Sequence, residues 1–193
     1  MNFLHNRICR SALWQRTVEE RLLPWALDGV DLTGRVLEIG PGFGATTRVL
    51  ARRTADLTAV EIDPRLAGRL RENLGDDVTV VTGDAAELPF PDASFDAVLS
   101  FTMLHHVPTP DLQDRIFAEA HRVLAPGGVL AGSDSLVSTL FRVIHIGDVM
   151  VPVDPATLPG RLGAAGFDDV AVSTAGGRSL RFRARLADRL AGG

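Results

Sequence analysis

The amino-acid sequence predicts an α/β protein with a doubly wound, mostly parallel sheet that is covered by helices on both faces. Two observations carry this prediction. From residue 35 onward, short runs rich in Val, Leu and Ile alternate with amphipathic segments of helical period. The first run passes directly into a glycine-rich turn at Gly40, Gly42 and Gly44, as strands of a parallel sheet do beside a ligand. Such alternation is typical of parallel strands joined by right-handed helical crossovers.

The individual elements follow from the spacing of apolar residues. Residues 1–30 are predicted to form a helical cover, in which Pro24 interrupts the run. Pro64 suits the first turn of a helix, and Asp63 before it can cap that helix. We expect strands at Arg35–Ile39, Leu57–Ile62, Val78–Val81, Phe95–Ser100 and Val129–Gly132. We expect helices between them at Thr46–Arg53, Pro64–Leu74 and Asp111–Leu124.

The pattern is less regular after residue 133. Ser135–Val153 is apolar and fits no single element, and Asp154 then caps a short helix that ends near Ala165. Two further strands are expected at Asp169–Ser173 and Leu180–Arg185. The two glycines between these strands predict a tight hairpin, and hence one antiparallel strand at the edge of the sheet.

Size and composition are those of a single domain with a sizeable core, because the chain has 193 residues of which 46% are hydrophobic. The net charge of −4 argues against nucleic-acid or anionic-membrane partners. No apolar run reaches about 18 residues, and the N-terminus lacks a signal-peptide pattern. The single cysteine, Cys9, excludes an intrachain disulfide and fits a reducing compartment. We therefore expect a cytoplasmic protein.

Two absent residue types exclude several chemistries. The chain has no tyrosine, and all 20 of its Lys and Arg residues are arginine. Without lysine there is no Walker A phosphate loop and no Schiff-base chemistry. Dehydrogenases that depend on a Tyr and Lys pair are excluded for the same reason.

Four carboxylates stand where predicted strands end. Glu38 precedes the glycine turn, Glu61 and Asp63 end the second strand, and Asp84 follows the third. The carboxyl ends of parallel strands meet at one crevice. One carboxylate there can accept both hydroxyls of a ribose, and another can accept from an exocyclic adenine amine. The sequence therefore predicts a site for a nucleotide-like cofactor.

The identity of that cofactor is open between two readings. The spacing Gly40-x-Gly42-x-x-Ala45, with Glu61 about 20 residues downstream, satisfies the dinucleotide fingerprint of NAD(P)-dependent oxidoreductases. A dinucleotide brings a doubly negative pyrophosphate to the turn. S-adenosylmethionine instead brings a sulfonium, an ammonium and one carboxylate. The additional acids near the turn favour the cationic ligand.

Five segments resemble, in the same order, the class I S-adenosylmethionine-dependent methyltransferases of the small-molecule, type 11 kind. The resemblance covers roughly residues 30–175. It implies a Rossmann-like sheet of seven strands in the order 3-2-1-4-5-7-6, with strand 7 antiparallel. The segments are Val36–Gly44, Ala59–Asp63, Gly83–Phe90, Phe95–Val107 and Arg122–Val129.

The resemblance also implies roles at the adenosine end of the cofactor. Glu61 is expected to hold the ribose hydroxyls, and Ile62 to pack on the adenine. Asp84 is expected to accept from the adenine amine, with the backbone of Ala85 beside the ring.

At the methionine end, the resemblance places Gly40 and Gly42 under the amino-acid part of the cofactor. Glu38 is expected to orient the ammonium group through water. The backbone at Ser100 and Phe101 is expected to close the other side.

The implied activity is transfer of a methyl group to an oxygen, nitrogen or carbon atom of a small molecule, with S-adenosylhomocysteine as the product. Such a transfer is an in-line displacement that depends chiefly on alignment. A base is needed only if the acceptor carries a proton, and His105 or His106 after the fourth strand is the candidate for that role. Pocket lining or loop stabilisation is the alternative for both. Because adjacent histidine side chains diverge, we expect no metal.

Residues outside the core are expected to shape the acceptor pocket. We expect one domain over residues 1–193, with N-terminal cover at 1–30, a cofactor-binding core at 31–134, and acceptor-side elements and the last strands at 135–193. The apolar character of residues 1–30 and 135–160 favours a hydrophobic or aromatic acceptor. Asp134 either touches this acceptor or caps a helix, and His145 is a further pocket candidate. A protein that binds the cofactor without catalysis remains an alternative.

A few other side chains have competing interpretations. Trp14, Trp25 and Phe3 are predicted either as a lid over the acceptor or as core residues. Arg181, Arg183 and Arg185 share one face of the last strand. A solvated edge strand protected by charge is favoured for them over an RNA-binding patch.

Overall fold

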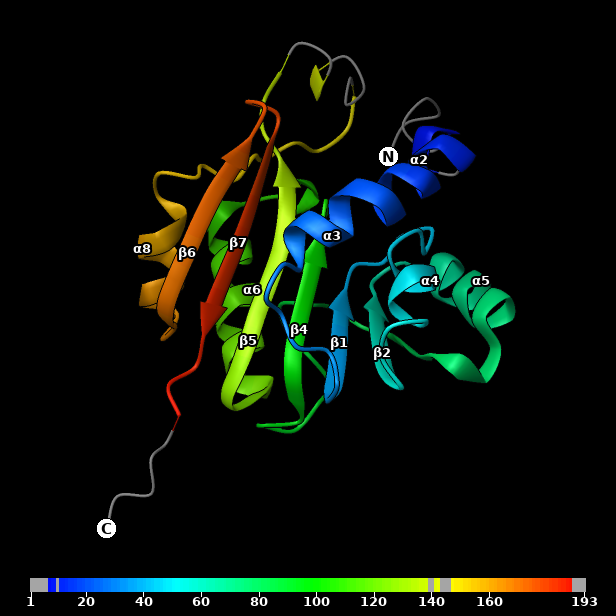
Figure 1. Ribbon diagram of the computed structural model, residues 1–193, viewed down its shortest axis with the longest axis horizontal. Helices are drawn as coiled ribbons and strands as arrows, with labels where there is room; N and C mark the ends of the chain where they lie inside the picture. Colours follow the sequence, from blue (N-terminus) through cyan, green and yellow to red (C-terminus); the bar gives the residue numbers. More distant parts are fainter. Residues whose placement is uncertain (1–6, 10, 139–140, 143–146, 189–193) are drawn as a thin grey trace.

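The computed structural model describes residues 7–9, 11–138, 141–142 and 147–188. Seven strands form one sheet in the order β3-β2-β1-β4-β5-β7-β6 (Figure 1). Strands β1 to β5 pair in parallel, and β7 runs antiparallel to both β5 and β6. The predicted fold class and strand order are therefore confirmed. The strands are β1 Arg35–Ile39, β2 Asp56–Glu61, β3 Thr79–Thr82, β4 Phe95–Phe101, β5 Leu124–Ser135, β6 Asp168–Ala175 and β7 Ser179–Arg185.

Helices cover both faces of the sheet. Neighbouring residues of a strand point to opposite faces, and β1 illustrates this. Leu37 packs in one core with Phe117 of α6, whereas Val36 packs in a second core with Leu23 of α3 and Leu70 of α5. The helices are α2 Ala12–Thr17, η1 Val18–Leu22, α3 Leu23–Ala26, α4 Thr47–Leu50, α5 Pro64–Leu74, η2 Gly75–Asp77, η3 Leu104–His106, α6 Pro110–Val123 and α8 Leu158–Ala164.

Most element boundaries agree with the predictions to within a few residues, and two differ further. Helix α4 is shorter than predicted because the N–H groups of Arg52 and Arg53 bond to carbonyls three residues back, which tightens the last turn out of the α-helix. Strand β5 is longer than the predicted Val129–Gly132 because β7 pairs with it as far as Ser135. Asp63 caps α5 as predicted, accepting from the Arg65 N–H at 2.8 Å.

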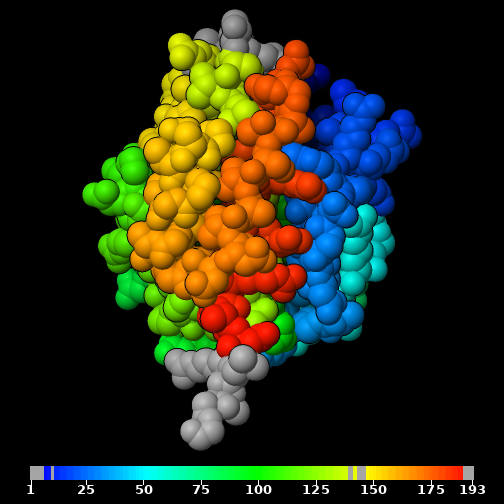
Figure 2. Space-filling view, turned by 60° about the vertical axis from the view of Figure 1, so that its left-hand side comes forward, coloured from blue at the N-terminus to red at the C-terminus, as the bar shows by residue number. Residues whose placement is uncertain are grey.

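The antiparallel strand does not lie at the edge, so that prediction is wrong. The hairpin folds β7 back between β5 and β6, and β6 becomes the outer strand. In Figure 2, atoms of β7 in red reach toward the N-terminal segment in blue, beside β6 in orange. Arg181 donates to the carbonyl of Trp25, and its guanidinium carbon lies 5.5 Å from the centre of the Trp25 ring. Arg181 therefore attaches the N-terminal segment to the sheet and does not protect a solvated edge.

The N-terminal cover is one continuous helical run from Ala12 to Ala26, and Pro24 does not end it. A π-turn precedes the proline, in which the Leu23 N–H bonds to the Val18 carbonyl. The run passes from α2, near the C-terminal ends of the strands, to α3 on the face of the sheet (Figure 1). Within the described ranges, no helix is long and apolar enough to cross a membrane.

Candidate active site

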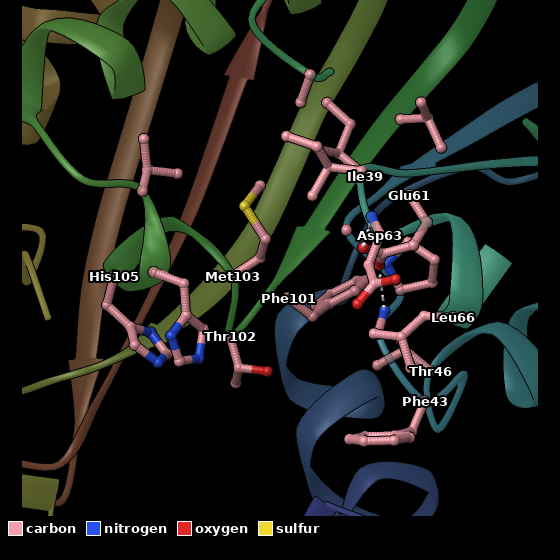
Figure 3. Close-up of a pocket in the computed structure, with 18 of the residues that line it drawn as sticks. Ile39, Phe43, Thr46, Glu61, Asp63, Leu66, Phe101, Thr102, Met103 and His105 are labelled. Carbon is pink, nitrogen blue, oxygen red and sulfur yellow. Dashed lines mark hydrogen bonds between the residues drawn. The ribbon is translucent and has the colours of Figure 1, made fainter. Parts of the chain in front are cut away.

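A cavity of about 720 Å³ lies at the C-terminal ends of β1, β2 and β4. This is the edge at which doubly wound sheets bind their ligands. Figure 3 shows Glu61 and Asp63 on one side of the cavity and His105 on the opposite side. Phe101 and Met103 project between them. The cavity thus has an acidic side next to the glycine turn and a second side next to η3.

The three glycines of the turn all have positive φ angles: +65° at Gly40, +56° at Gly42 and +75° at Gly44. A Cβ atom at Gly40 would overlap the side chain of Met103, and one at Gly44 would overlap Leu70. Gly42 differs, because a Cβ there would meet nothing within 4 Å. The main chain at Gly42 is therefore accessible from the cavity, and a ligand can approach it closely.

Glu61 is held in a fixed orientation beside this turn. It is 5% exposed, and one carboxylate oxygen accepts from the Gly42 N–H at 2.9 Å. The other oxygen accepts from the Asp63 N–H at 3.0 Å (Figure 3). Each oxygen of a carboxylate can accept a second hydrogen bond. The group is thus aligned to receive two neighbouring hydroxyls, as a ribose presents them.

The adenine end of the predicted site is open and partly apolar. Ile62 lines the cavity and is 65% exposed, unusual for a side chain of its type. Asp84 lines the same region, where one carboxylate oxygen accepts from the Ala86 N–H at 2.8 Å. The Gly83 N–H bonds to the Glu61 carbonyl at 3.1 Å and so holds the ends of β2 and β3 together. Ala85 also lines this end.

Glu38 lies behind the glycine turn and does not line the cavity. It is buried, and the Thr46 hydroxyl donates to its Oε1. Burial raises the pKa of this carboxyl to about 7. Oε2 has no hydrogen-bond partner within the described part of the chain. Thr46 itself lines the cavity, so any effect of Glu38 on a ligand passes through Thr46 or through water.

The chain after β4 forms the wall between the two sides of the cavity. Phe101 lines the cavity, whereas the Ser100 side chain is buried within the sheet and does not. Thr102 has a positive φ angle of 50°, and its N–H bonds to the Ser133 carbonyl at 2.8 Å. This turn directs Met103 across Gly40. Met103 was missed from the sequence, where only its position after a strand end signalled a role.

The two histidines of η3 both line the cavity, but they differ in their contacts. His105 is 2% exposed, and its Nδ1 bonds to the carboxylate of Asp134 at the end of β5. The His105 N–H also donates to this carboxylate, at 3.0 Å. The ring of His106 lies 4.1 Å from that of His105, centre to centre. Within the described residues, the Asp134 carboxylate accepts from the His105 and Ser135 N–H groups and caps no helix that follows it, so that prediction is not confirmed. Asp134 does not line the cavity, and its contact with an acceptor stays a prediction.

The side of the cavity near η3 is otherwise mostly apolar. Trp14 of α2 lines the cavity and also packs against the second core, and Trp25 packs against that core and Arg181. Core packing is therefore confirmed for both tryptophans, and a lid over the acceptor stays a prediction. Cys9 lines the cavity too, and burial raises the pKa of its thiol to about 11. Phe3 and His145 lie outside the described residues. Apolar lining residues on this side are Val107, Leu112, Ile116 and Phe141, whereas Ile8, Cys9 and Trp14 come from the N-terminal segment, which contacts the end of the glycine turn.

Comparison with known proteins places this site in a family. Residues 37–132 match the family described as a methyltransferase domain. The chain is 38% identical over 125 residues to demethylmenaquinone methyltransferase of Tropheryma whipplei, covering 63% of this chain and 47% of that protein. It is 33% identical over 113 residues to a sterol 24-C-methyltransferase of Gibberella zeae, covering 55% of this chain and 29% of that protein. The chain thus spans less than half the length of both relatives.

A solved structure with a similar fold matches this chain over almost its whole length. A SAM-dependent methyltransferase from Thermotoga maritima superposes with a TM-score of 0.70 at 22% identity, covering 96% of this chain and 99% of that chain. Dinucleotide-binding sheets commonly have the order 3-2-1-4-5-6, whereas here an antiparallel β7 lies between β5 and β6. The nicotinamide alternative is therefore not favoured. The chain belongs to the class I S-adenosylmethionine-dependent methyltransferases, as the resemblance implied.

Proposed function

We propose that this protein transfers a methyl group from S-adenosylmethionine to an oxygen, nitrogen or carbon atom of a small molecule. The observation that carries the proposal is the composition of the cavity. A bare main chain at Gly42 and an aligned carboxylate at Glu61 stand on one side, and a largely apolar chamber continues on the other. The side next to the glycine turn suits a nucleoside, and the apolar side next to η3 suits the methyl acceptor. The cofactor, when bound, supplies a methyl group already activated by a sulfonium.

The residues of the acidic side fit an adenosyl group. We propose that Glu61 accepts from the ribose hydroxyls, that Asp84 accepts from the adenine amine, and that Ile62 covers one face of the ring beside Ala85. The exposure of Ile62 supports this role, because a flat apolar ligand would remove that side chain from water.

The methionine part is proposed to lie along Gly40 and Gly42, with the main chain at Ser100 and Phe101 opposite. Glu38 is proposed to act on the ammonium group from behind the turn. Its buried, unpaired Oε2 supports this role, because a buried carboxylate oxygen without a partner is costly and a water or an ammonium would satisfy it.

The acceptor is proposed to be an apolar small molecule bound next to η3. Apolar residues of α6, together with Val107 and Phe141, line this side. Two of the relatives are named for methylation of a sterol and of demethylmenaquinone. The N-terminal cover and the residues after 135 are proposed to be the acceptor-side parts of a single domain. Water exclusion and alignment are then the chief contributions of the protein to the rate.

Equilibrium binding tests the donor half of this proposal. Isothermal titration of the purified protein with S-adenosylmethionine and S-adenosylhomocysteine should give micromolar affinities, with no binding of NAD or NADP. Binding of NAD(P) without binding of either adenosyl compound would refute it. A protein that binds the donor but methylates none of a broad panel of acceptors would instead be a non-catalytic binder.

A further inference from the structure

The two edges of the sheet are protected to different degrees. One edge is β3, which is only four residues long. Arg71 of α5 covers it, because the guanidinium donates to the Val80 carbonyl and to the Thr82 hydroxyl, each at 3.0 Å. An edge strand that is short and covered by a charged side chain offers little to another chain. The β3 edge is therefore closed to further strand pairing.

The opposite edge is β6, which is eight residues long and pairs with β7 alone within the described residues. Helix α8 covers one face of this strand, where Leu158 and Leu162 pack with Val172, and leaves its outer edge open. Over residues 169–174, the described main chain bonds to no element other than β7. Figure 2 looks toward this side of the molecule, where β6 in orange lies at the surface beside α8 in yellow.

The sequence of β6 lacks the features that usually keep an edge strand from pairing. Such strands are protected by a charged residue, a proline or a bulge. Residues 170–175 contain no charged residue and no proline, and the register shift between Asp168 and Ala171 lies at the start of the strand. In an antiparallel pair, every second residue directs its N–H and C=O groups away from its neighbour. The middle of β6 thus presents a row of main-chain groups to one more strand.

The charges at the two ends of β6 identify the strand that fits as a second copy of this chain. Asp168 and Asp169 precede the uncharged stretch, and Arg178 follows it in the hairpin. All three are exposed, and none forms an ion pair within the described residues. Two copies that pair antiparallel bring the acidic end of each strand to the basic end of the other. The edge is therefore complementary to itself.

Twofold symmetry restricts the register of such a pair. The same surface must serve both copies, so the residue on the axis lies opposite its own copy. Asp168 and Arg178 are each five positions from Ser173. With Ser173 on the axis, Asp168 of each copy therefore comes to Arg178 of the other, and opposite charges on facing strands stabilise a pair. In this register Ala171 lies opposite Ala175 of the second copy, and both side chains are small.

We infer that the protein forms a symmetric dimer in which the β6 strands of two copies pair antiparallel, with Ser173 on the twofold axis. The two sheets then join into one continuous sheet, and the outward main-chain groups of β6 gain partners. No described residue of β6 lines the cavity, so the inference does not depend on the proposed function.

The first experiment tests association through this edge. Sedimentation equilibrium of the purified full chain should give a mass of about twice 20.7 kDa, which falls toward 20.7 kDa on dilution. We expect amide hydrogen exchange of residues 170–175 to slow as the protein concentration rises, because the outward N–H groups become bonded. A chain that stays monomeric at all concentrations overturns the inference. A dimer whose β6 amides exchange as fast as those of the monomer also overturns it.

The second experiment tests the charges at the ends of the strand. Arg178→Glu places an acid near Asp168 of the second copy, twice in each dimer. We expect the dissociation constant of the dimer to rise by about tenfold or more, with little change in the melting temperature of the dilute protein. Arg53→Glu, which makes the same change at an exposed position after α4, is the matched control and should dimerise as the wild type does. Equal dissociation constants for the two variants contradict the pairing of these ends.

The third experiment tests the register with Ser173→Cys in a Cys9→Ser background. Opposed residues of an antiparallel pair have Cα atoms about 4.5–5.5 Å apart, a separation that a disulfide spans. We therefore expect this variant to form a disulfide-linked dimer on mild oxidation. Thr174→Cys is the matched control, because its own copy lies two positions away along the strand, and it should cross-link far more slowly. Equal or faster cross-linking of Thr174→Cys overturns this register. An intact dimer that binds no adenosyl compound would refute the proposed function and leave the dimer standing.

Discussion

At the scale of single residues, the site is built from acids that the backbone holds in place. Glu61 and Asp84 each accept a hydrogen bond from a main-chain N–H and retain capacity for a ligand. Their placement at strand ends was predictable, because parallel strands bring their carboxyl ends to one crevice. The pairing of His105 with Asp134 could not be predicted from the sequence, because it depends on how the turn after β4 meets the end of β5.

Removing either acid should weaken donor binding. We expect Glu61→Ala and Asp84→Ala each to raise the Kd for S-adenosylhomocysteine by about tenfold or more, the effect of losing one charge-assisted hydrogen bond. Calorimetric titration measures this effect. Glu87→Ala, an exposed acid three residues after Asp84, is the matched control and should bind normally. Wild-type affinity in both acid variants would mean that the donor lies elsewhere.

The glycines of the turn should differ in what they contribute. Gly42→Ala places a Cβ where the cavity is open, so we expect a stability loss of only about 1–2 kcal/mol from the positive φ angle, together with a clear loss of donor affinity. Gly40→Ala adds an overlap with Met103, and we expect a larger loss of stability. Denaturant unfolding and calorimetry separate the two effects. Equal stability of the two variants would contradict the packing role of Gly40.

Glu38 should make stability depend on pH. Its folded pKa of about 7 lies above the usual value of 4.5, so the folded state holds the proton more tightly than the unfolded chain does. The contribution of Glu38 to the free energy of unfolding is therefore fully present below about pH 4.5, where the carboxyl is protonated, and is lost as pH rises through about 7. The Gln side chain in Glu38→Gln stays neutral at every pH. We therefore expect the free energy of unfolding of this variant to rise relative to that of the wild type by up to about 3 kcal/mol between pH 5 and pH 8. The matched control is Glu72→Gln, at an exposed position of α5. A difference between Glu38→Gln and wild type that does not change with pH would contradict this.

At the scale of elements, the apolar periodicity located every strand and most helix boundaries. Helix α5 has the predicted limits because Asp63 and Pro64 define its start. The short α4 and the long β5 were not predictable, because tertiary pairing and local turn geometry determine where each ends. The strand order came from family resemblance, since alternation of strands and helices alone does not specify it.

One arginine of α6 holds the segment that carries Asp84. Arg122 donates to the carbonyls of Leu88 and Phe90 and pairs with Glu119, whose carboxylate in turn accepts from the Leu88 N–H. We expect Arg122→Ala to lower the free energy of unfolding by about 1–3 kcal/mol and to weaken donor binding, because the loop loses its anchor. Thermal unfolding and calorimetry measure the two effects. Arg53→Ala, at an exposed position after α4, is the control and should change neither.

At the scale of the whole molecule, the cavity depends on segments that are far apart in the sequence. The N-terminal run supplies Trp14, and Arg181 connects that run to the sheet through Trp25. We expect Arg181→Ala to reduce stability by about 1–2 kcal/mol and to speed hydrogen exchange of the amides in α3. Arg185→Ala, on the same face of β7, is the control. Equal exchange in the two variants would show that the contact between Arg181 and Trp25 does not hold the cover.

The central claim is that the adenosyl group lies against Gly42 with its ribose hydroxyls on Glu61. A crystal structure of the protein with S-adenosylhomocysteine tests it most directly. We expect both ribose oxygens within about 2.5–3.0 Å of the Glu61 carboxylate, with the sulfur directed toward η3. A bound ligand whose ribose does not touch Glu61 would contradict the account.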